Sequence, residues 1–339
     1  MKILIIKRDK IGDMLLVTPM LEHLRQSLPK ATIDFLANDY NYFILRGNKN
    51  IDNLHLYFRT KHNGKFRFLA FLHELFITLK LNLKKYDVVI AAGGVYSPRA
   101  IKRAIRLNGK RTIGFILNNS QTLSGLTDPI KLPSNLHEVE ANYLLLKPLG
   151  IEPPCKKIDP FLYIKPSWME YAVNWLRENH VNKFIVIGIN SRRDKRKPSD
   201  EQILSWSKNI YAHYKVKTVL IWQPGEQNNK IYPGDNERMK SFLNNLPSYI
   251  VPLKTDISIF QAVAVIQYAK VSILPDGGLA HIASVSKGGV IALFAETDVS
   301  PHPDNWKPYT NQSQYLEAKK TVEELNDDFV VSKIEEYLN

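Results

Sequence analysis

The segment RDKIGDMLLVTP (residues 8–19) places a carboxylate, Asp13, between a strand-like run and an apolar stretch that ends in Thr-Pro. A carboxylate exposed at the end of a strand can take a proton from a hydroxyl group and so act as a general base. The preceding Gly12 lets another molecule approach the backbone closely. Asp is also a preferred N-cap, and a carboxylate in a first helical turn suits the helix dipole. Position alone therefore leaves Asp13 open to a catalytic role or a capping role.

The segment ILPDGGLAHIAS (residues 273–284) predicts a strand, a tight bend and then a helix. Backbone N–H groups at the start of a helix can bind phosphate without any side chain. This bend is therefore a candidate anion site, formed by Asp276, Gly277, Gly278, Leu279 and His281. In the structural alternative, Asp276 caps the helix, the glycines permit positive φ and His281 is a packed side chain.

Two more polar segments follow predicted strands. The first, GINSRRDKRKPSDEQ (residues 188–202), gathers five cations before a helix: Arg192, Arg193, Lys195, Arg196 and Lys197. Cations at a positive helix end can neutralise a pyrophosphate without a metal, although a basic surface loop has the same composition. The second, LIWQPGEQ (residues 220–227), leaves Glu226 past a strand end, where it could bind a pair of sugar hydroxyls or be an ordinary turn residue.

Each of these segments follows a short hydrophobic run, and such runs alternate with helical patterns along the chain. This alternation predicts parallel sheets with helices on both faces. We therefore expect an α/β protein of two doubly wound domains, each with its ligand edge at the carboxyl ends of its strands. A length of 339 residues agrees with two domains, and the proline-rich segment 149–166 is the expected hinge.

The net charge of +13 belongs almost wholly to the first half, because residues 1–150 contain 23 Lys and Arg against 11 Asp and Glu. Such a field suits nucleic acid, an anionic membrane, or a phosphorylated or carboxylated ligand, and solubility alone also explains it. No DNA-binding motif is legible and the cations do not interleave with aromatic residues, so nucleic acid is not the expected partner. A gel shift at physiological salt would identify a nucleic-acid-binding protein.

Three features bear on location and cofactors. Polar residues interrupt the most apolar stretch, residues 66–83, which predicts a buried helix, or alternatively one resting on a bilayer surface, instead of a spanning helix. The start MKILIIKRDK reads as a strand followed by charges instead of a signal peptide, so a cytoplasmic location is expected. The single Cys155 cannot form an intramolecular disulfide, and no Cys/His cluster has zinc spacing, so neither a metal nor a cofactor is expected.

The chain resembles a known family in four places: IGDMLLVTP, KRTIGF near residue 112, the basic turn before Pro198, and DGGLAHIA followed by ALFAETD. They resemble the ADP-heptose:lipopolysaccharide heptosyltransferases, inverting glycosyltransferases of the GT-B fold, in order and spacing over nearly the whole chain. The resemblance implies two Rossmann-like domains facing a central cleft. Residues 1–155 would bind the acceptor, residues 156–315 would bind the nucleotide sugar, and C-terminal helices in 316–339 would pack back on the first domain.

The resemblance also implies an activity, which is the metal-independent transfer of a heptose from ADP-heptose to the inner core of lipopolysaccharide with inversion. The partners would be a nucleotide-diphosphate sugar, the anionic lipopolysaccharide core acceptor and the inner-leaflet membrane surface. Such a protein would be cytoplasmic and peripheral at the inner face of the inner membrane, and we expect a monomer.

The resemblance assigns roles to single residues. Asp13 matches the proposed catalytic base. The donor-binding positions are Gly12, Asn190, Ser191, Lys195, Glu226, Asp276, Gly277, Gly278, Leu279 and His281. Among these, Asn190, Ser191 and Lys195 would hold the diphosphate, Glu226 would lie near the nucleoside, and Asp276 would face heptose hydroxyls. For the Kdo carboxylates and lipid A phosphates of the acceptor, our candidates are Arg59, Lys61, Lys65, Arg67 and Arg99, followed by Lys102 and Arg103.

Four departures from the family pattern limit these assignments. Gly277 stands where the family usually has Thr or Ser, Lys197 where Trp is common, Ala295 where Gly is frequent, and Ala141 where Arg is frequent. The first two leave the donor open and Ala141 leaves the acceptor contact open. The alternatives are a related GT-B transferase with another nucleotide sugar or a protein or capsular acceptor, and a non-catalytic sugar-binding protein.

Overall fold

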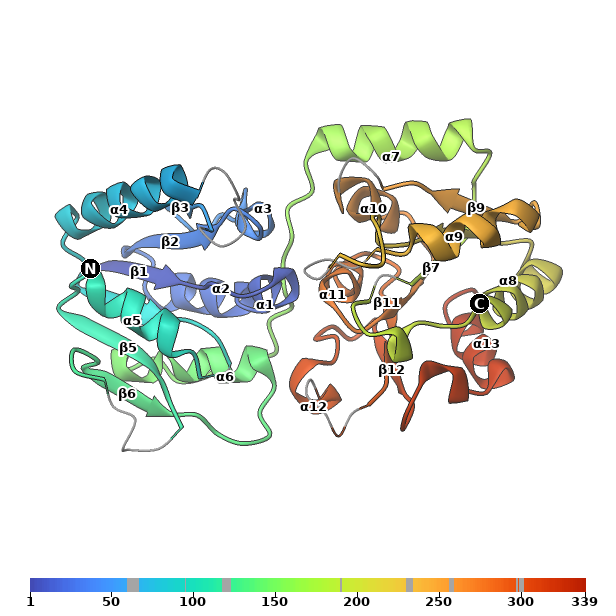
Figure 1. The fold of residues 1–339 in the computed structure, drawn as a ribbon. Coiled ribbons are helices and arrows are strands. Elements are labelled where there is room, and N and C mark those ends of the chain that lie inside the picture. Colours follow the sequence, from blue (N-terminus) through green and yellow to red (C-terminus); the bar gives the residue numbers. More distant parts are fainter. Residues whose placement is uncertain are drawn as a thin grey trace. The chain divides into compact units, whose positions relative to one another are not determined.

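A computed structural model describes residues 1–59, 67–94, 96–117, 123–189, 191–229, 234–255, 259–296, 298 and 302–339, except for the side chain of Arg67. The chain divides into two compact units, Met1–Tyr163 and Ile164–Asn339. Each unit is a parallel six-stranded sheet with helices on both faces (Figure 1). The expected α/β fold of two doubly wound domains is thereby confirmed.

The first sheet has the strand order β3-β2-β1-β4-β5-β6, with every neighbouring pair parallel. Its strands are β1 (Lys2–Ile6), β2 (Thr32–Asn38), β3 (Asn53–Tyr57), β4 (Val88–Ala91), β5 (Arg111–Ile116) and β6 (Asp128–Lys131). Its helices are α1 (Ile11–Leu15), α2 (Thr18–Ser27), α3 (Tyr42–Leu45), α4 (Arg67–Leu83), α5 (Pro98–Arg106), α6 (Glu138–Leu144) and the 3-10 turn η3 (Lys147–Leu149).

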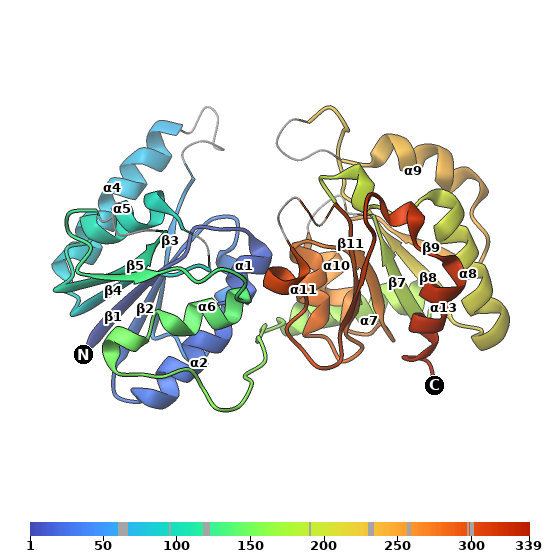
Figure 2. The same ribbon diagram turned by 90° about the horizontal axis from the view of Figure 1, so that it is seen from below.

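Successive side chains of β1 point to opposite faces of the sheet, and the buried ones are apolar on both faces. Leu4 and Ile6 join a core with Ile77 of α4 and Ile101 of α5, and all four side chains are buried. The view of Figure 2 shows α4 and α5 on one face of the sheet and α2 and α6 on the other. A strand that is apolar on both sides is what a doubly covered parallel sheet requires.

The second sheet has the order β12-β11-β10-β7-β8-β9 and is also parallel. Its strands are β7 (Phe184–Gly188), β8 (Lys217–Ile221), β9 (Ile250–Leu253), β10 (Ser272–Pro275), β11 (Val290–Phe294) and β12 (Gln314–Glu317). Its helical segments are α7 (Pro166–Glu178), η4 (Asp194–Arg196), α8 (Asp200–Tyr214), α9 (Asn236–Phe242), η5 (Leu243–Asn245), α10 (Ile259–Ile266), α11 (Gly278–Ser284), α12 (Pro303–Trp306), η6 (Val322–Glu324) and α13 (Asp327–Glu335).

The C-terminal segment joins the core of the second unit. The hydroxyl of Thr321 caps η6 and the Asn326 side chain caps α13, as helix starts require. Val330 and Ile334 of α13 are buried in the core of the second unit, in the same cluster as Trp206 of α8. The apolar face of α13 is thus covered within its own unit. The expected packing of residues 316–339 on the first domain stays a prediction.

In each sheet the strand order reverses next to its first strand. The first sheet runs outward in both directions from β1 and β4, and the second from β7 and β10. Ligands of open α/β sheets bind at such switch points, outside the carboxyl ends of the strands. The segments that follow β1, β7 and β10 are those that contain Asp13, Lys195 and Asp276.

Candidate functional site

A buried ion pair lies at the switch point of the first unit. Lys7, directly after β1, places its Nζ 2.7 Å from Oε1 of Glu138, the first residue of α6, and each side chain is 1% exposed. Asp9 lies 3.5 Å from the same ammonium. A Cβ on Gly94 would overlap the Glu138 carboxylate, so only glycine fits beside it. Charges buried to this extent persist because they are paired.

Asp13 belongs to the same electrostatic cluster. Burial alone would lower the pKa of Lys7, but the carboxylates of Glu138, Asp9 and Asp13 outweigh burial and raise it. Burial raises the pKa of Glu138 against the opposing effect of Lys7, and the negative charge of Asp13 raises it further. Lys7 is thus the buried counter-ion shared by three carboxylates, Asp13 among them.

Asp13 also has the capping role. It is the third residue of α1, half-buried, and its Oδ2 accepts a hydrogen bond of 2.8 Å from the backbone N–H of Lys10. The neighbouring Gly12 is buried within α1. The capping contact holds the carboxylate in a fixed position, and a fixed position is also what a general base needs.

In the second unit, a buried pair joins the turn after β7 to the bend after β10. Nη1 of Arg196 lies 2.6 Å from Oδ2 of Asp276, and their side chains are 4% and 8% exposed. Two other guanidinium nitrogens, Nε and Nη2, are buried and have no hydrogen-bond partner among the described residues. Such N–H groups are unusual in a native protein, and a ligand anion would satisfy them.

Two other cations of this turn, Lys195 and Lys197, are also held by carboxylates. Nζ of Lys195 lies 2.7 Å from Oε1 of Glu296, with the lysine side chain 62% exposed. Lys197 is buried, pairs with Asp235, and lies 2.9 Å from Asp194. The family position that commonly carries Trp is therefore occupied here by a lysine in a buried ion pair.

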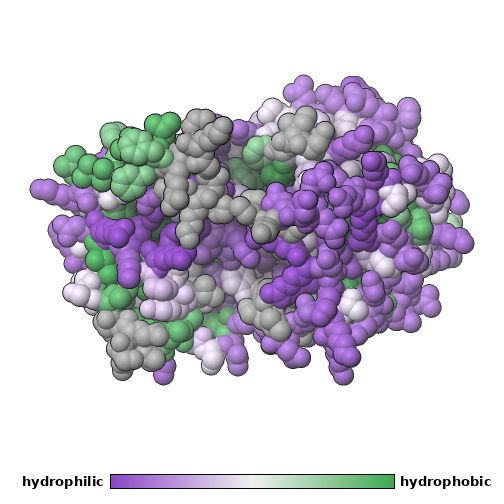
Figure 3. Space-filling model, in the orientation of Figure 1, coloured by the Kyte–Doolittle hydropathy of each residue, from purple (hydrophilic) through white to green (hydrophobic). Residues whose placement is uncertain are grey.

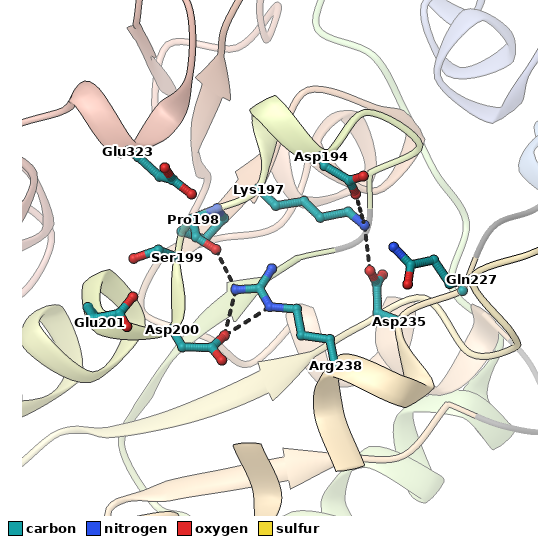
Figure 4. Close-up of a pocket in the computed structure, with 11 residues that line it drawn as sticks. Asp194, Lys197, Pro198, Ser199, Asp200, Glu201, Gln227, Asp235, Arg238 and Glu323 are labelled. Carbon is teal, nitrogen blue, oxygen red and sulfur yellow. Dashed lines mark hydrogen bonds and ion pairs between the residues drawn. The ribbon is translucent and has the colours of Figure 1, made fainter. Parts of the chain in front are cut away.

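Figure 4 shows the pocket beside this turn, about 360 Å³ in volume, where Lys197 points toward Asp194 and Asp235 and Arg238 points toward Asp200. Five carboxylates line it against these two cations: Asp194, Asp200, Glu201, Asp235 and Glu323. The surplus negative charge makes this pocket unsuitable for a diphosphate. Arg196 is not among its lining residues, so the two nitrogens of Arg196 that have no described partner do not belong to this pocket.

The bend after β10 contains four more of the predicted donor residues beside Asp276. Gly277 is the N-cap of α11, Gly278 begins the helix, and Leu279 is buried. His281 is also buried, which lowers its pKa to about 4, and its Nδ1 has no partner in the described part of the chain. This histidine is consequently neutral at pH 7 and adds no positive charge to an anion site.

The structure brings some predicted donor residues together. Lys195 lies in the same turn as Arg196, which contacts Asp276, and Ser191 accepts a backbone hydrogen bond from Arg193 in that turn. Glu226 is exposed at the end of β8, on the same edge of the sheet, with no described contact to the Arg196 pair. Asn190 lies outside the described residues.

The predicted acceptor cations that the structure describes differ in their contacts. Nε of Arg59 donates to Asp39 over 2.8 Å, and its guanidinium lies over the Tyr40 ring. Arg103 pairs with Glu74 and lies over the ring of Tyr57, which assigns it a structural role. Arg99 and Lys102 are exposed on α5. Lys61, Lys65 and the side chain of Arg67 lie outside the described residues.

Sequence reasoning missed the two pairs that organise these sites. It counted Arg196 as one of five loop cations and did not single out Lys7 or Glu138. The available signal for Lys7 was its place directly after the four apolar residues 3–6, where a lysine must be buried or turn away. Its partner is 131 residues distant, so no local pattern connects them.

Comparison with known proteins identifies the family. The family model described as glycosyltransferase family 9 (heptosyltransferase) matches residues 77–328. The chain belongs to glycosyltransferase family 9. Among curated relatives, this family 9 protein is 24% identical to lipopolysaccharide heptosyltransferase 3 of Escherichia coli over 308 residues, which cover 88% of this chain and 84% of that protein.

Solved structures share the fold of this family 9 protein. A family 9 glycosyl transferase from Veillonella parvula has a TM-score of 0.81 at 18% identity, covering 99% of this chain and 97% of that one. E. coli ADP-heptose lipopolysaccharide heptosyltransferase II has a TM-score of 0.76 at 18% identity, covering 100% and 98%. E. coli heptosyltransferase WaaC with ADP has a TM-score of 0.74 at 20% identity, covering 99% and 100%. The GT-B architecture expected from the resemblance is thereby confirmed.

No helix in the described part of the chain is both long and apolar enough to cross a bilayer. Within the described ranges, no group of three or more His, Cys, Asp or Glu side chains is placed to hold a metal ion.

Proposed function

We propose that this protein transfers a heptose from ADP-heptose to the inner core of lipopolysaccharide, with inversion at the anomeric carbon. Membership of the heptosyltransferase family supports the reaction class, and the likeness to lipopolysaccharide heptosyltransferase 3 of E. coli supports the acceptor class. The enzyme acts as a monomer in the cytoplasm, at the inner face of the inner membrane. The proposal requires no metal, since protein cations neutralise the diphosphate.

The observation that carries the proposal is the guanidinium of Arg196. It is buried at the switch point of the second sheet, held by Asp276, and has two N–H-bearing nitrogens without a described partner. Charge-assisted hydrogen bonds to phosphate oxygens are the strongest contacts that such a group makes. The second unit would thus bind the nucleotide diphosphate, with Lys195 reaching it from the same turn.

Asp13 acts as the general base in this proposal. The acceptor hydroxyl oxygen forms a bond to the anomeric carbon while the bond from that carbon to the diphosphate oxygen breaks. The proton of the hydroxyl passes to the Asp13 carboxylate, and ADP leaves with the electron pair of the broken bond. Arg196 and Lys195 stabilise the negative charge that grows on the departing diphosphate.

The sharpest test is Asp13→Asn, assayed with ADP-heptose and a truncated Kdo-lipid A acceptor. The amide oxygen can still accept the hydrogen bond from Lys10, so α1 keeps its cap, but an amide cannot take the proton. We expect turnover to fall by roughly 100- to 10,000-fold, the usual contribution of a general base, with ADP binding unchanged. Glu140→Gln removes an exposed carboxylate from α6 and serves as the matched control.

The donor is tested in the same assay. ADP-heptose is compared with UDP- and GDP-sugars, because Gly277 lacks the hydroxyl that the family usually has. Turnover with another nucleotide sugar alone would replace the proposed donor, and turnover of Asp13→Asn at the wild-type rate would remove Asp13 from the chemistry. ADP binding without transfer to any acceptor would favour a sugar-binding protein.

A further inference from the structure

Helix α4 (Arg67–Leu83) presents an apolar surface to solvent. Eight of its large hydrophobic side chains are between 42% and 81% exposed: Phe68, Leu69, Phe71, Leu72, Leu75, Phe76, Leu79 and Leu83. In Figure 3 the hydrophobic colour gathers over the place where Figure 1 shows α4. Contiguous exposed patches of this kind mark interaction sites, whereas single exposed hydrophobic residues do not. The expectation of a buried helix is therefore wrong for this face.

This exposure is not confined to one end of α4, and it does not arise because the helix is detached from the sheet. Ala70, Ile77 and Leu81 form a buried stripe that fixes α4 on the sheet. Glu74, the one acidic residue of the helix, is turned aside to pair with Arg103 of α5. A surface helix normally turns its polar residues toward solvent, whereas the solvent-facing side of α4 is mostly apolar. This apolar outer face implies an apolar partner.

Cations flank this apolar face. Arg103 contacts α4 through Glu74, and Nδ2 of Asn82 donates to the backbone oxygen of Arg106, so α5 lies against α4. Other cations of α4 and α5 are exposed, namely Lys80, Arg99, Lys102 and Arg106. Residues 67–106 contain eight Lys and Arg against two Asp and Glu. The partner must therefore be both apolar and anionic.

We propose that the exposed faces of α4 and α5 dock this protein on an anionic lipid bilayer. Helix α4 would lie flat, with its phenylalanine and leucine side chains among the acyl chains nearest the headgroups, while the α5 cations contact lipid phosphates. A second copy of the chain is disfavoured, because a two-fold contact would set this cationic rim against itself. The inference rests on the proposed function in one respect, since a lipid-linked acceptor is presented at such a surface.

The test is co-sedimentation with vesicles of phosphatidylglycerol and phosphatidylethanolamine in equal parts, compared with vesicles of phosphatidylcholine alone. We expect the wild type to sediment with the anionic vesicles and remain in solution with the neutral ones. Phe68→Ser combined with Phe76→Ser should lower anionic binding at least about tenfold, because it removes two of the inserted side chains. Arg99→Glu combined with Lys102→Glu should lower it similarly, and more so at low salt.

The matched control replaces Phe161 and Phe329 by Ser, because these side chains are 46% and 48% exposed and lie outside α4 and α5. Its binding should equal that of the wild type. All variants change exposed residues, and a thermal melt verifies that they fold. Equal vesicle binding by the Phe68/Phe76 variant and the control would overturn the proposal. So would a wild-type dimer that this variant converts to monomers.

The outcome is independent of catalysis, because vesicle binding is measured without donor or acceptor. Loss of vesicle binding in the Phe68/Phe76 variant, with undiminished transfer to a delipidated acceptor, would support both proposals. If the wild type transfers heptose but does not sediment with anionic vesicles, docking and the proposed membrane location are overturned, while the proposed reaction stands. If it sediments but transfers no heptose, the proposed function is overturned alone.

Discussion

The guanidinium of Arg196 meets the carboxylate of Asp276 at 2.6 Å across 80 residues of sequence, and so joins the turn after β7 to the bend after β10. These strands are neighbours at the switch point of the second sheet. Asp276 occupies one nitrogen of the guanidinium and fixes its plane, while Nε and Nη2 stay without a described partner. In the proposed function, the pair would preorganise an anion receptor instead of merely cancelling two charges.

We predict that Arg196→Lys weakens ADP binding by roughly 10- to 100-fold, because lysine keeps the charge but lacks the planar fork of donors. Isothermal titration with ADP measures the effect. Arg238→Lys is the control, since Arg238 pairs with Asp200 in the same unit and makes a similar fork. Equal losses in the two variants would mean that Arg196 does not contact the phosphates.

Arg196→Met should instead affect folding. It leaves the Asp276 carboxylate buried without its counter-ion, and breaking a buried pair from one side costs about 3–5 kcal/mol of unfolding free energy. Denaturant unfolding of this variant, with Asp276→Asn added in a second variant, measures the cost. The second substitution should restore part of the stability because the buried charge is gone. No recovery would contradict the pairing.

The pair Lys7–Glu138 allows a related prediction for the first unit. Lys7→Met alone leaves Glu138 buried and charged, so we expect it to destabilise the protein by about 3–5 kcal/mol, and Lys7→Met with Glu138→Leu to destabilise it less. Denaturant unfolding of both variants measures the two costs. A double variant no more stable than Lys7→Met alone would contradict the pairing.

The strands and the site segments were predictable from local pattern. The runs ILII (residues 3–6) and FIVI (residues 184–187) are apolar at every position, which a strand covered on both faces requires, and the polar residues that follow them must lie at the ligand edge. The edge strands β6 (DPIK) and β12 (QYLE) escaped prediction, because a short strand with one exposed face is half polar.

The partners of buried charges were not predictable in the same way. Two of the five cations in this segment turn inward, and their partners Asp235 and Asp276 follow 38 and 80 residues later in the chain. The exposure of the outward face of α4 was also not predictable. An apolar helix is expected to be buried, and only the tertiary fold shows whether another element covers it. Both depend on tertiary packing, which local periodicity does not encode.

His281 makes the stability of the second unit depend on pH. Burial lowers its pKa from 6.5 to about 4, so the unfolded chain takes up a proton at a higher pH than the folded one. Stability is then complete above pH 6.5 and is lost as pH falls from 6.5 toward 4, by about 3 kcal/mol over the whole window. Unfolding by denaturant at several pH values measures this slope.

The variant His281→Gln should flatten that slope whatever its effect on stability at pH 7. His213→Gln is the control, because that side chain is exposed on α8. A slope that persists in His281→Gln and disappears in His213→Gln would place the titrating group elsewhere.

Position 277 is where a side-chain hydroxyl can be added to the bend after β10. Its backbone is extended, with φ 160°, and the nearest described atom that a Cβ would meet is the Pro275 carbonyl oxygen, 3.9 Å away. A serine fits there without strain, and its hydroxyl would lie at the first turn of α11. If that bend binds a phosphate, Gly277→Ser adds a donor, and we expect ADP to bind roughly fivefold more tightly, as one hydrogen bond of about 1 kcal/mol implies.

The free energy of unfolding distinguishes Gly277 from a glycine that the backbone requires. Gly277→Ser should leave the free energy of unfolding unchanged, whereas Gly289→Ser should lower it, because Gly289 has φ 69° and a Cβ there would overlap the backbone of Gln312. Titration of each folded variant with ADP then isolates the hydroxyl. Weaker binding by a fully stable Gly277→Ser would mean that the diphosphate is held by the Arg196 turn without this bend.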